Sequence, residues 1–486
     1  METPQRRVVP VVFLAVLLAT LSARAVDYTF TGKAPPPGDH TWSAPANWSP
    51  NGVPGNGDTA TISGLVTTYV TLDQPVTISG LTLAGANLRV ANNLAVSGAF
   101  KLQAATLAGA GTITANGSVS IDPLPGTPGV LTYLGCPLVV NGQAVINPNA
   151  TLTYTAQVAI QNNGTFTLAN NATLDFGNNV AGQFINTSMF AASNSIVAGG
   201  NAAALFTNAP GGTVSALSGV LQIGAGPAVA SSGAFNAGSN CVIKLTANAA
   251  FHDGATFTGP GTTLLDSMAN TADGTITTLG NLQLGDGFVS ANLTELGTLN
   301  IAAGANFNWL GSTIQGNNSN IVGRILVSGS MTLGGEIPLY LLSTIINNNG
   351  TVNWTNDWIL TMGYGASIVN GSRFYASGST TMTPLTSGEA GHNVASFQNG
   401  RPSDTNYDGS LGTFIVNLAT NLTVVIAVPF YNSGGDVFLQ GGNLDFEGGG
   451  ALDGSYVADG RGGRFHRVRG RHLCHADEGV FRRQHQ

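Results

Sequence analysis

The chain has 486 residues and a formal net charge of −7, and only 8% of its residues are charged, against about 25% in typical globular domains. Lys and Glu, which favour exposed helices, are scarce, whereas Thr, Asn, Ser, Gly and β-branched residues are abundant. This composition excludes a helical or α/β enzyme and favours a long all-β protein. Residues 26–450 carry an excess of acidic over basic side chains, so no nucleic acid is expected as a partner.

The first 25 residues read as a secretory signal peptide. Arg6 and Arg7 precede an apolar run over residues 8–21, and Ala23-Arg24-Ala25 ends in a small-x-small cleavage pattern. The run is shorter than the roughly 20 residues of a membrane span, and no later stretch is long and apolar enough. We therefore expect cleavage after Ala25, a secreted or cell-surface location, and no transmembrane segment in the mature chain.

Residues 26–64 differ from the rest and are expected to form an N-terminal cap. Trp42 and Trp48 are followed by turn residues and by Asp58. Terminal repeats of stacked proteins are atypical because one of their faces has no neighbour, and bulky aromatic residues suit that place. The alternative is a Trp-lined sugar platform, although no paired carboxylates or further exposed aromatics accompany it.

Residues 65–450 contain internal repeats. Ala105–Ile113 reappears in similar form as Ala255–Thr263. A second motif consists of an apolar residue, Asn, a short Gly turn and β-branched residues, and its glycines are separated by multiples of about 45 residues. Its copies are 160–166, 206–214, 346–352 and 430–437.

Short alternating strands lie between these turns, for example at 81–83, 88–90 and 94–96. Three-residue strands are too short for a sandwich but suffice in a parallel β-helix, where each rung bonds to its neighbours. We predict a β-solenoid with about 21 residues per rung and roughly 18 rungs, with Asn ladders at its turns. The alternative is a β-propeller with units of about 45 residues, which would need four longer strands per unit.

The opening motif W-x5-W-S…G-V-P-G-x-G-D-T-A-x-I, followed by Leu/Thr/Gly rungs and the Asn-Gly modules, resembles exported bacterial repeat proteins of the pectin-lyase-like β-helix and autotransporter or adhesin passenger type. The resemblance covers most of residues 40–450. It implies a right-handed parallel β-helix that is secreted or displayed at the cell surface.

Residues 451–486 form an atypical basic tail with seven Arg. Three interpretations compete: a basic arm for nucleic acid or anionic glycan, a metal site at His472, Cys474 and His475, and a shifted reading frame. We favour the third because composition changes abruptly within the repeat pattern. The tail would then be disordered, and the last rung would end in an open strand edge.

One segment resembles a calcium loop. Asp404, Asn406 and Asp408 are spaced like the first ligands of such a loop, and Gly409 follows them. The twelfth position is Ile415, where a carboxylate belongs, so an Asx-rich surface turn is the competing interpretation. No other cofactor is expected.

Other candidate reactive groups are sparse. Asp266 and Asp273 lie in Gly/Thr turns in which no His or Arg partner is evident. Cys136 and Cys241 would lie about five rungs apart, roughly 24 Å, so we expect both to be buried free thiols.

Two functions remain open. The favoured one is a non-catalytic secreted or cell-surface rod, structural or adhesive, that contacts glycans or other cell-surface components. The alternative is a carbohydrate-active β-helix enzyme, either a polysaccharide lyase or a glycoside hydrolase.

Overall fold

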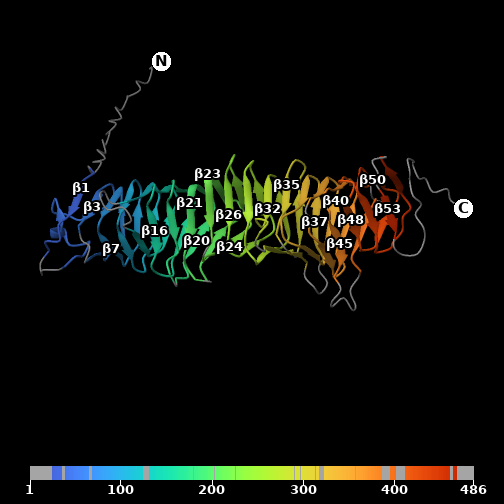
Figure 1. The fold of residues 1–486 in the computed structure, drawn as a ribbon. Helices are drawn as coiled ribbons and strands as arrows, with labels where there is room; N and C mark the ends of the chain where they lie inside the picture. Colours follow the sequence, from blue (N-terminus) through green and yellow to red (C-terminus); the bar gives the residue numbers. More distant parts are fainter. Residues whose placement is uncertain are drawn as a thin grey trace, which may run out of the picture.

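The chain is coiled into a parallel β-solenoid of about 16 turns (Figure 1). The computed structural model describes residues 25–467 except 35–38, 65–67, 124–130, 179, 202, 225, 289–290, 296, 312, 317–321, 356, 386–393, 401–410 and 460–463. The helix in this part of the chain is a single 3₁₀ turn, η1 (Pro45–Asn47). The predicted all-β solenoid is confirmed.

Each turn contributes one strand to each of three stacks, which we call the first, second and third faces. The first face consists of β3 (Thr59–Ser63), β6 (Gly80–Ala84), β9 (Phe100–Gln103), β12 (Ser118–Asp122), β15 (Gln143–Ile146), β18 (Thr165–Leu168), the first half of β21 (Met189–Ala198), the first half of β23 (Thr213–Ile223), β25 (Ala234–Ala237), β28 (Thr256–Thr258), β31 (Thr275–Thr278), β34 (Thr298–Ile301), β37 (Gly323–Val327), β40 (Thr344–Asn348), β43 (Ser367–Asn370), β46 (Ser396–Asn399) and β49 (Phe430–Asn432).

The second face follows the first within each turn. It consists of β4 (Tyr69–Leu72), β7 (Asn87–Val90), β10 (Thr106–Ala108), β13 (Thr132–Gly135), β16 (Thr151–Tyr154), β19 (Thr173–Asp175), the second halves of β21 and β23, β26 (Val242–Leu245), β29 (Thr262–Leu265), β32 (Asn281–Leu284), β35 (Asn306–Trp309), β38 (Ser330–Leu333), β41 (Thr351–Trp354), β44 (Arg373–Ala376), β47 (Thr413–Val416), β50 (Asp436–Leu439) and β52 (Ser455–Ala458).

The third face completes the turn. It consists of β5 (Val76–Ile78), β8 (Leu94–Val96), β11 (Ile113–Ala115), β14 (Leu138–Val140), β17 (Ala159–Asn162), β20 (Gln183–Asn186), β22 (Leu205–Asn208), β24 (Ala228–Ser231), β27 (Ala249–Phe251), β30 (Asn270–Ala272), β33 (Asn292–Glu295), β36 (Thr313–Gln315), β39 (Leu339–Leu342), β42 (Leu360–Gly363), β45 (Thr381–Pro384), β48 (Thr423–Ile426), β51 (Asn443–Phe446) and β53 (Arg464–Arg467).

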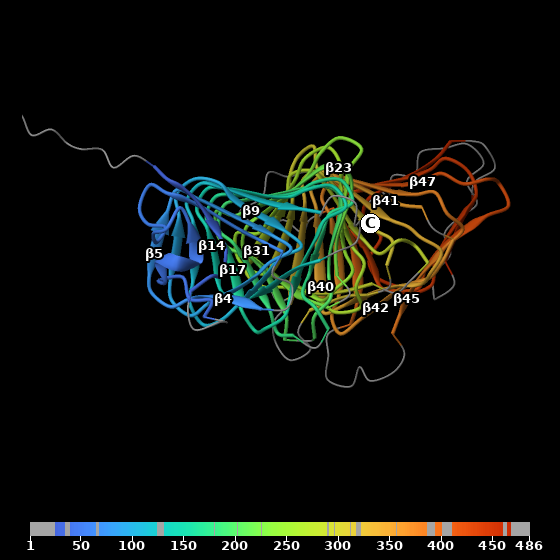
Figure 2. The ribbon, with the colours of Figure 1, turned by 90° about the vertical axis from the view of Figure 1, so that its left-hand side faces the viewer.

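The turns vary in length around the predicted 21 residues, and one of the short steps runs from Leu81 to Phe100, 19 residues on. The amide of Asn186 bonds to Asn208, 22 residues on, whereas Asn399 bonds to Asn432, 33 residues on. At β21 and β23 the chain continues as one strand through a corner, and the register shifts between Ala192 and Ser195. Figure 2 shows successive turns displaced sideways from the N-terminal to the C-terminal end.

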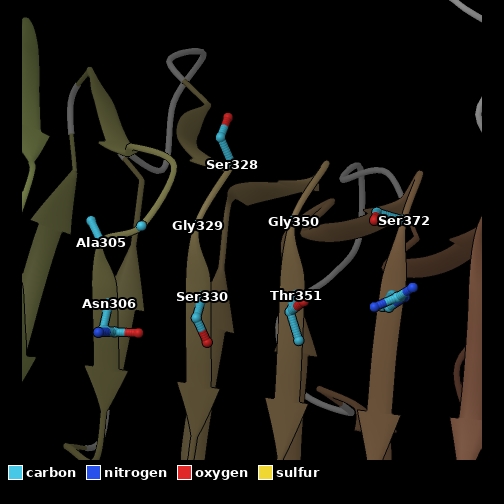
Figure 3. A pocket seen from close by; sticks show the side chains of 10 residues that line it. Ala305, Asn306, Ser328, Gly329, Ser330, Gly350, Thr351 and Ser372 are labelled. Carbon is cyan, nitrogen blue, oxygen red and sulfur yellow. The ribbon is translucent and has the colours of Figure 1, made fainter.

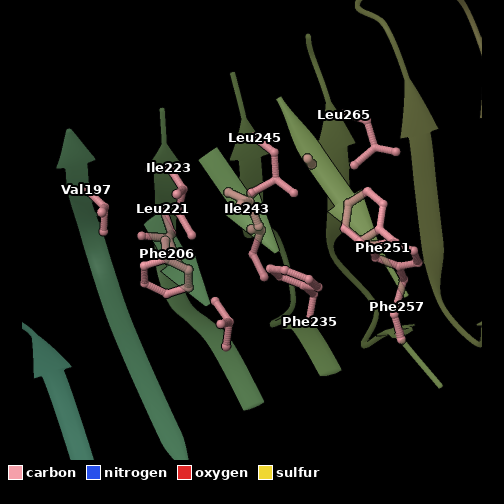
Figure 4. Packing of buried hydrophobic residues seen from close by; sticks show 14 of the residues in the cluster. Val197, Phe206, Leu221, Ile223, Phe235, Ile243, Leu245, Phe251, Phe257 and Leu265 are labelled. Atoms are coloured by element: carbon pink, nitrogen blue, oxygen red, sulfur yellow. The ribbon is translucent and has the colours of Figure 1, made fainter. Parts of the chain in front are cut away.

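The interior of the coil is a continuous apolar core. Strands alternate one buried and one outward side chain, as β18 does, because successive side chains of a strand point to opposite faces. Equivalent residues on adjacent turns then stack: the rings of Phe184 and Phe206 lie 5.2 Å apart and are nearly parallel. Figure 4 shows the same pattern at Phe235 and Phe257, which pair in register and whose rings are stacked with centroids 5.8 Å apart.

The N-terminal segment lies against the edges of the first turn. β1 (Asp27–Phe30) pairs with β3 in the first face and with β2 (Trp48–Ser49), while Thr41 bridges to Thr71 in the second face. Trp42 and Trp48 are buried with ring centroids 4.7 Å apart. Both indole N–H groups donate to backbone carbonyls. The two tryptophans are therefore core residues at this end, and their rings do not form an open platform.

Strand pairing continues beyond residue 450, where the sequence analysis places the end of the repeats. β52 pairs with β50, and β53 pairs with β51. Tyr456 lies between Phe446 and Phe465, with ring centroids 6.3 Å and 5.8 Å away. The first 17 residues of the expected tail thus include two strands of the coil. In the described part of the chain, no helix is long and apolar enough to cross a membrane.

Candidate functional site

The predicted calcium ligands Asp404, Asn406 and Asp408 lie outside the described residues, as do His472, Cys474 and His475. Among the described residues, no three His, Cys, Asp or Glu side chains gather as a metal site would require. The structure therefore leaves calcium binding at residues 404–408 as a prediction.

The two described cysteines are free and buried. Desolvation by burial raises the pKa of the Cys136 thiol to about 12, so this thiol stays protonated at neutral pH. Nucleophilic thiol chemistry needs the thiolate. Cys136 therefore serves the coil as a small apolar residue.

Several carboxylates along the coil are engaged in turn contacts or in pairs between adjacent turns. Asp58 accepts hydrogen bonds from the backbone N–H groups of Val26 and Gly55, both at 2.9 Å. Asp266 forms an ion pair of 2.7 Å with Lys244. Such contacts hold turns in place.

Asp273 has a histidine partner that the sequence analysis did not identify. His252 Nδ1 lies 2.9 Å from its carboxylate, and both side chains are about half exposed. Asp266 follows the second-face strand β29, whereas Asp273 follows the third-face strand β30. One face of the coil therefore separates the two carboxylates, which lie at different corners.

Buried asparagines form two ladders through the coil. The first joins Asn162, Asn186, Asn208 and Ser231 at the corner between the third and first faces. The second joins Asn348, Asn370, Asn399 and Asn432 at the corner between the first and second faces. In each ladder the side-chain amide donates to the next Asn or Ser and to a backbone carbonyl beyond the corner. This is the ladder pattern expected from the Asn-Gly modules.

A shallow groove of about 390 Å³ runs across four turns at the corner between the first and second faces. Its lining comes from Gly304–Asn306, Ser328–Ser330, Gly350–Thr351 and Ser372–Arg373, where β35, β38, β41 and β44 begin. Figure 3 shows Asn306, Ser330 and Thr351 on three neighbouring strands. The sequence analysis did not identify this site.

Backbone forms the floor of the groove because two glycines stack there. A methyl group at Gly350 would lie 2.1 Å from the carbonyl oxygen of Gly329, and one at Gly329 would lie 2.3 Å from those of Ala302 and Ala305. Larger residues at these positions would force the turns apart. The 21-residue spacing of these two glycines was the sequence signal for the groove.

Hydroxyl and amide side chains line the walls. Among the described residues, the hydroxyls of Ser328, Ser330, Thr351 and Ser372 have no hydrogen-bond partner in the protein, in contrast to the buried Ser195 hydroxyl, which donates to Ala169 O. Arg373, at the C-terminal end, is exposed and forms no ion pair with a described residue. The groove thus offers uncharged hydrogen-bonding groups and one cation to a ligand.

The second face continues this polar surface beyond the groove. Two outward rows run along it in register: one consists of Asn306, Ser330, Thr351 and Arg373, and the next consists of Asn308, Thr332, Asn353 and Tyr375.

Comparison with known proteins identifies no relative of this chain. No family model matches the sequence, and no match was found among the curated proteins or the solved structures.

Proposed function

We propose that this protein is an exported, non-catalytic rod with a structural or adhesive role at a bacterial cell surface, of the autotransporter or adhesin passenger type. The signal-peptide pattern of residues 1–25 and the opening motif of residues 42–62 support export and this class. The rod contacts glycans or other surface components through its outward polar rows.

The observation that carries the proposal is the use of polar side chains to join adjacent turns. The buried amides form ladders, and Asp266 pairs with Lys244 one turn away. In a stacked repeat protein, each turn is stabilised mainly by its two neighbours. Polar contacts between adjacent turns favour a long and rigid coil. Length and rigidity are the properties that a spacer or adhesive rod needs.

The test compares adhesion with catalysis in one preparation. The chain from residue 26 onward is incubated with pectin, alginate and cell-wall polysaccharides, and both retention on the polymer and release of reducing ends are measured. Retention without release supports the rod. Release of reducing ends at a rate that scales with protein concentration would instead establish the polysaccharide-degrading enzyme.

Export is tested separately. The full chain is expressed in a Gram-negative host, and the N-terminus of the exported protein is sequenced. A mature end at Val26 supports the proposal, whereas retention of the uncut chain in the cytoplasm contradicts it.

A further inference from the structure

We propose that the groove between the first and second faces binds a linear glycan that carries one acidic group, with the acidic end at Arg373. The proposal rests on the adhesive role proposed above and names the ligand class for one site of the rod.

The unbonded hydroxyls of the groove suit the hydroxyl groups of sugars. Ser328, Ser330 and Thr351 come from neighbouring turns, and none of these hydroxyls is satisfied by a described protein group. A hydroxyl both donates and accepts hydrogen bonds, so a row of them can follow a chain of hydroxylated rings.

The shape of the groove favours a linear ligand parallel to the rod axis. Its lining repeats once per turn over four turns, and adjacent strands lie about 4.8 Å apart, so the row is roughly 14 Å long. The backbone floor at Gly329 and Gly350 lets a chain lie close to the main chain. A compact ligand would leave most of these groups without a contact.

Charge limits the number of acidic groups. Among the described residues, Arg373 is the one charged side chain that lines the groove. A guanidinium binds a carboxylate or sulfate through two parallel hydrogen bonds. Residues 26–450 carry far more acidic than basic side chains, so a polyanion would be repelled by the rest of the rod. A chain with a single acidic group matches both conditions.

The experiment measures affinity by calorimetry with the chain from residue 26 onward. The probes are cellotetraose, mannotetraose and galactotetraose, each either uncharged or ending in one uronate, and tetragalacturonate as the polyanion. The variants are Arg373→Gln and Thr351→Val. Their matched controls are Arg324→Gln and Thr298→Val, which alter outward residues of the same types on the first face. Melting temperatures establish that all variants remain folded.

We expect at least one uronate-terminated chain to bind about tenfold more tightly than its uncharged form. Arg373→Gln should abolish this preference, and Thr351→Val should weaken both forms by about fivefold. The two controls should bind as the unaltered protein does, and tetragalacturonate should bind more weakly than the best single-uronate chain.

Two results would overturn the groove site: equal affinities for unaltered protein and Arg373→Gln, or no binding of any tetrasaccharide at millimolar concentration. If the protein still adheres to polymer without releasing reducing ends, the rod function stands while the groove site fails. Release of reducing ends refutes the rod function whatever the groove variants show.

Discussion

The second amide ladder offers a direct test of what holds the turns together. Asn370 is fully buried. It accepts a hydrogen bond from Asn348 Nδ2 at 2.8 Å and donates to Asn399 Oδ1 at 2.8 Å and to Thr413 O at 3.1 Å. Replacing Asn370 with Ala therefore removes three hydrogen bonds and leaves a donor and two acceptors without their partners.

The expected loss is large for a single side chain. A buried polar group that loses its partner costs about 1–3 kcal/mol, and acceptors lie at the lower end because a carbonyl tolerates partial satisfaction. Asn348 Nδ2 keeps its second bond, to Arg373 O. We therefore expect Asn370→Ala to lower the local stability by about 3–5 kcal/mol.

An isosteric variant separates hydrogen bonding from cavity formation. Asn370→Asp leaves no cavity but points a carboxylate oxygen at Asn399 Oδ1 and Thr413 O, which are both acceptors. At pH 7 it should destabilise the coil at least as much as Asn370→Ala, because a buried charge without a partner is costly. The control is Asn163→Ala, which removes exposed amide bonds to Asn141 and Thr187.

Amide hydrogen exchange followed by mass spectrometry measures the effect turn by turn. Because each turn interacts mainly with its neighbours, protection should fall around residues 344–436 and remain unchanged around the first ladder. The control should change protection by less than about 1 kcal/mol. The reasoning is refuted if Asn370→Ala loses no more protection than Asn163→Ala, or if the loss spreads evenly along the chain.

Three further predictions concern the core and the turns. Trp42→Ala removes a fully buried indole at the N-terminal end and should cost about 3–5 kcal/mol; proteolysis should then begin near β3, which the half-exposed control Trp358→Ala should not cause. Gly350→Ala places a methyl group 2.1 Å from a backbone oxygen and should lower the melting temperature more than Gly304→Ala, which meets open space and only a positive φ of 82°; equal shifts would contradict the close approach. Cys136 should resist iodoacetamide at pH 8 until urea unfolds the chain. Since its pKa rises from 9.0 to about 12 on folding, its contribution to stability is complete below pH 9 and is lost as pH rises toward 12; rapid labelling of the native protein would disprove the burial.

The repeat architecture was predictable because it depends on local patterns. Short alternating strands and Gly turns predict stacked rungs wherever they recur. The Asn-Gly modules also located two members of each ladder: Asn162 and Asn208 in the first, and Asn348 and Asn432 in the second. Those side chains lie where the motif predicts, at corners between faces.

The remaining ladder members could not be found from spacing. The step from Asn348 to Asn370 is 22 residues, but the next steps are 29 and 33, since added loop residues lengthen a turn without changing its register. The pairs Lys244–Asp266 and His252–Asp273 are each separated by one turn of close to the predicted length, so the repeat spacing was a usable signal for them that the sequence analysis did not apply. The groove was not predicted because its lining comes from four turns. Finding it requires knowing which residues of those turns lie at the same corner.

The end of the repeats was difficult to place for a different reason. Composition changes near residue 450, but the backbone hydrogen bonds of a parallel ladder do not depend on side-chain identity. The segment around Tyr456 and Phe465 retains the outward and inward alternation, so it pairs with β50 and β51. A change of composition is therefore a weaker boundary signal in a coil than in a globular domain.

The low charge of this chain follows from the geometry of a parallel coil. In register, each outward side chain lies about 4.8 Å from its equivalent on the next turn, and like charges at that distance destabilise a sheet. Amides and hydroxyls avoid this cost because one residue can donate to the previous turn and accept from the next, as Asn141 does between Asn116 and Asn163.

The same reasoning explains where charges do occur. Among the described residues, Lys101–Asp122 and Lys244–Asp266 each join opposite charges on adjacent turns, and His252 contacts Asp273 in the same way. Arg373 departs from this arrangement, since its in-register neighbours are Thr351 and Thr413. Arg373 has no acidic partner among the described residues, and it lines the groove, which is why the acidic end of a ligand is placed there.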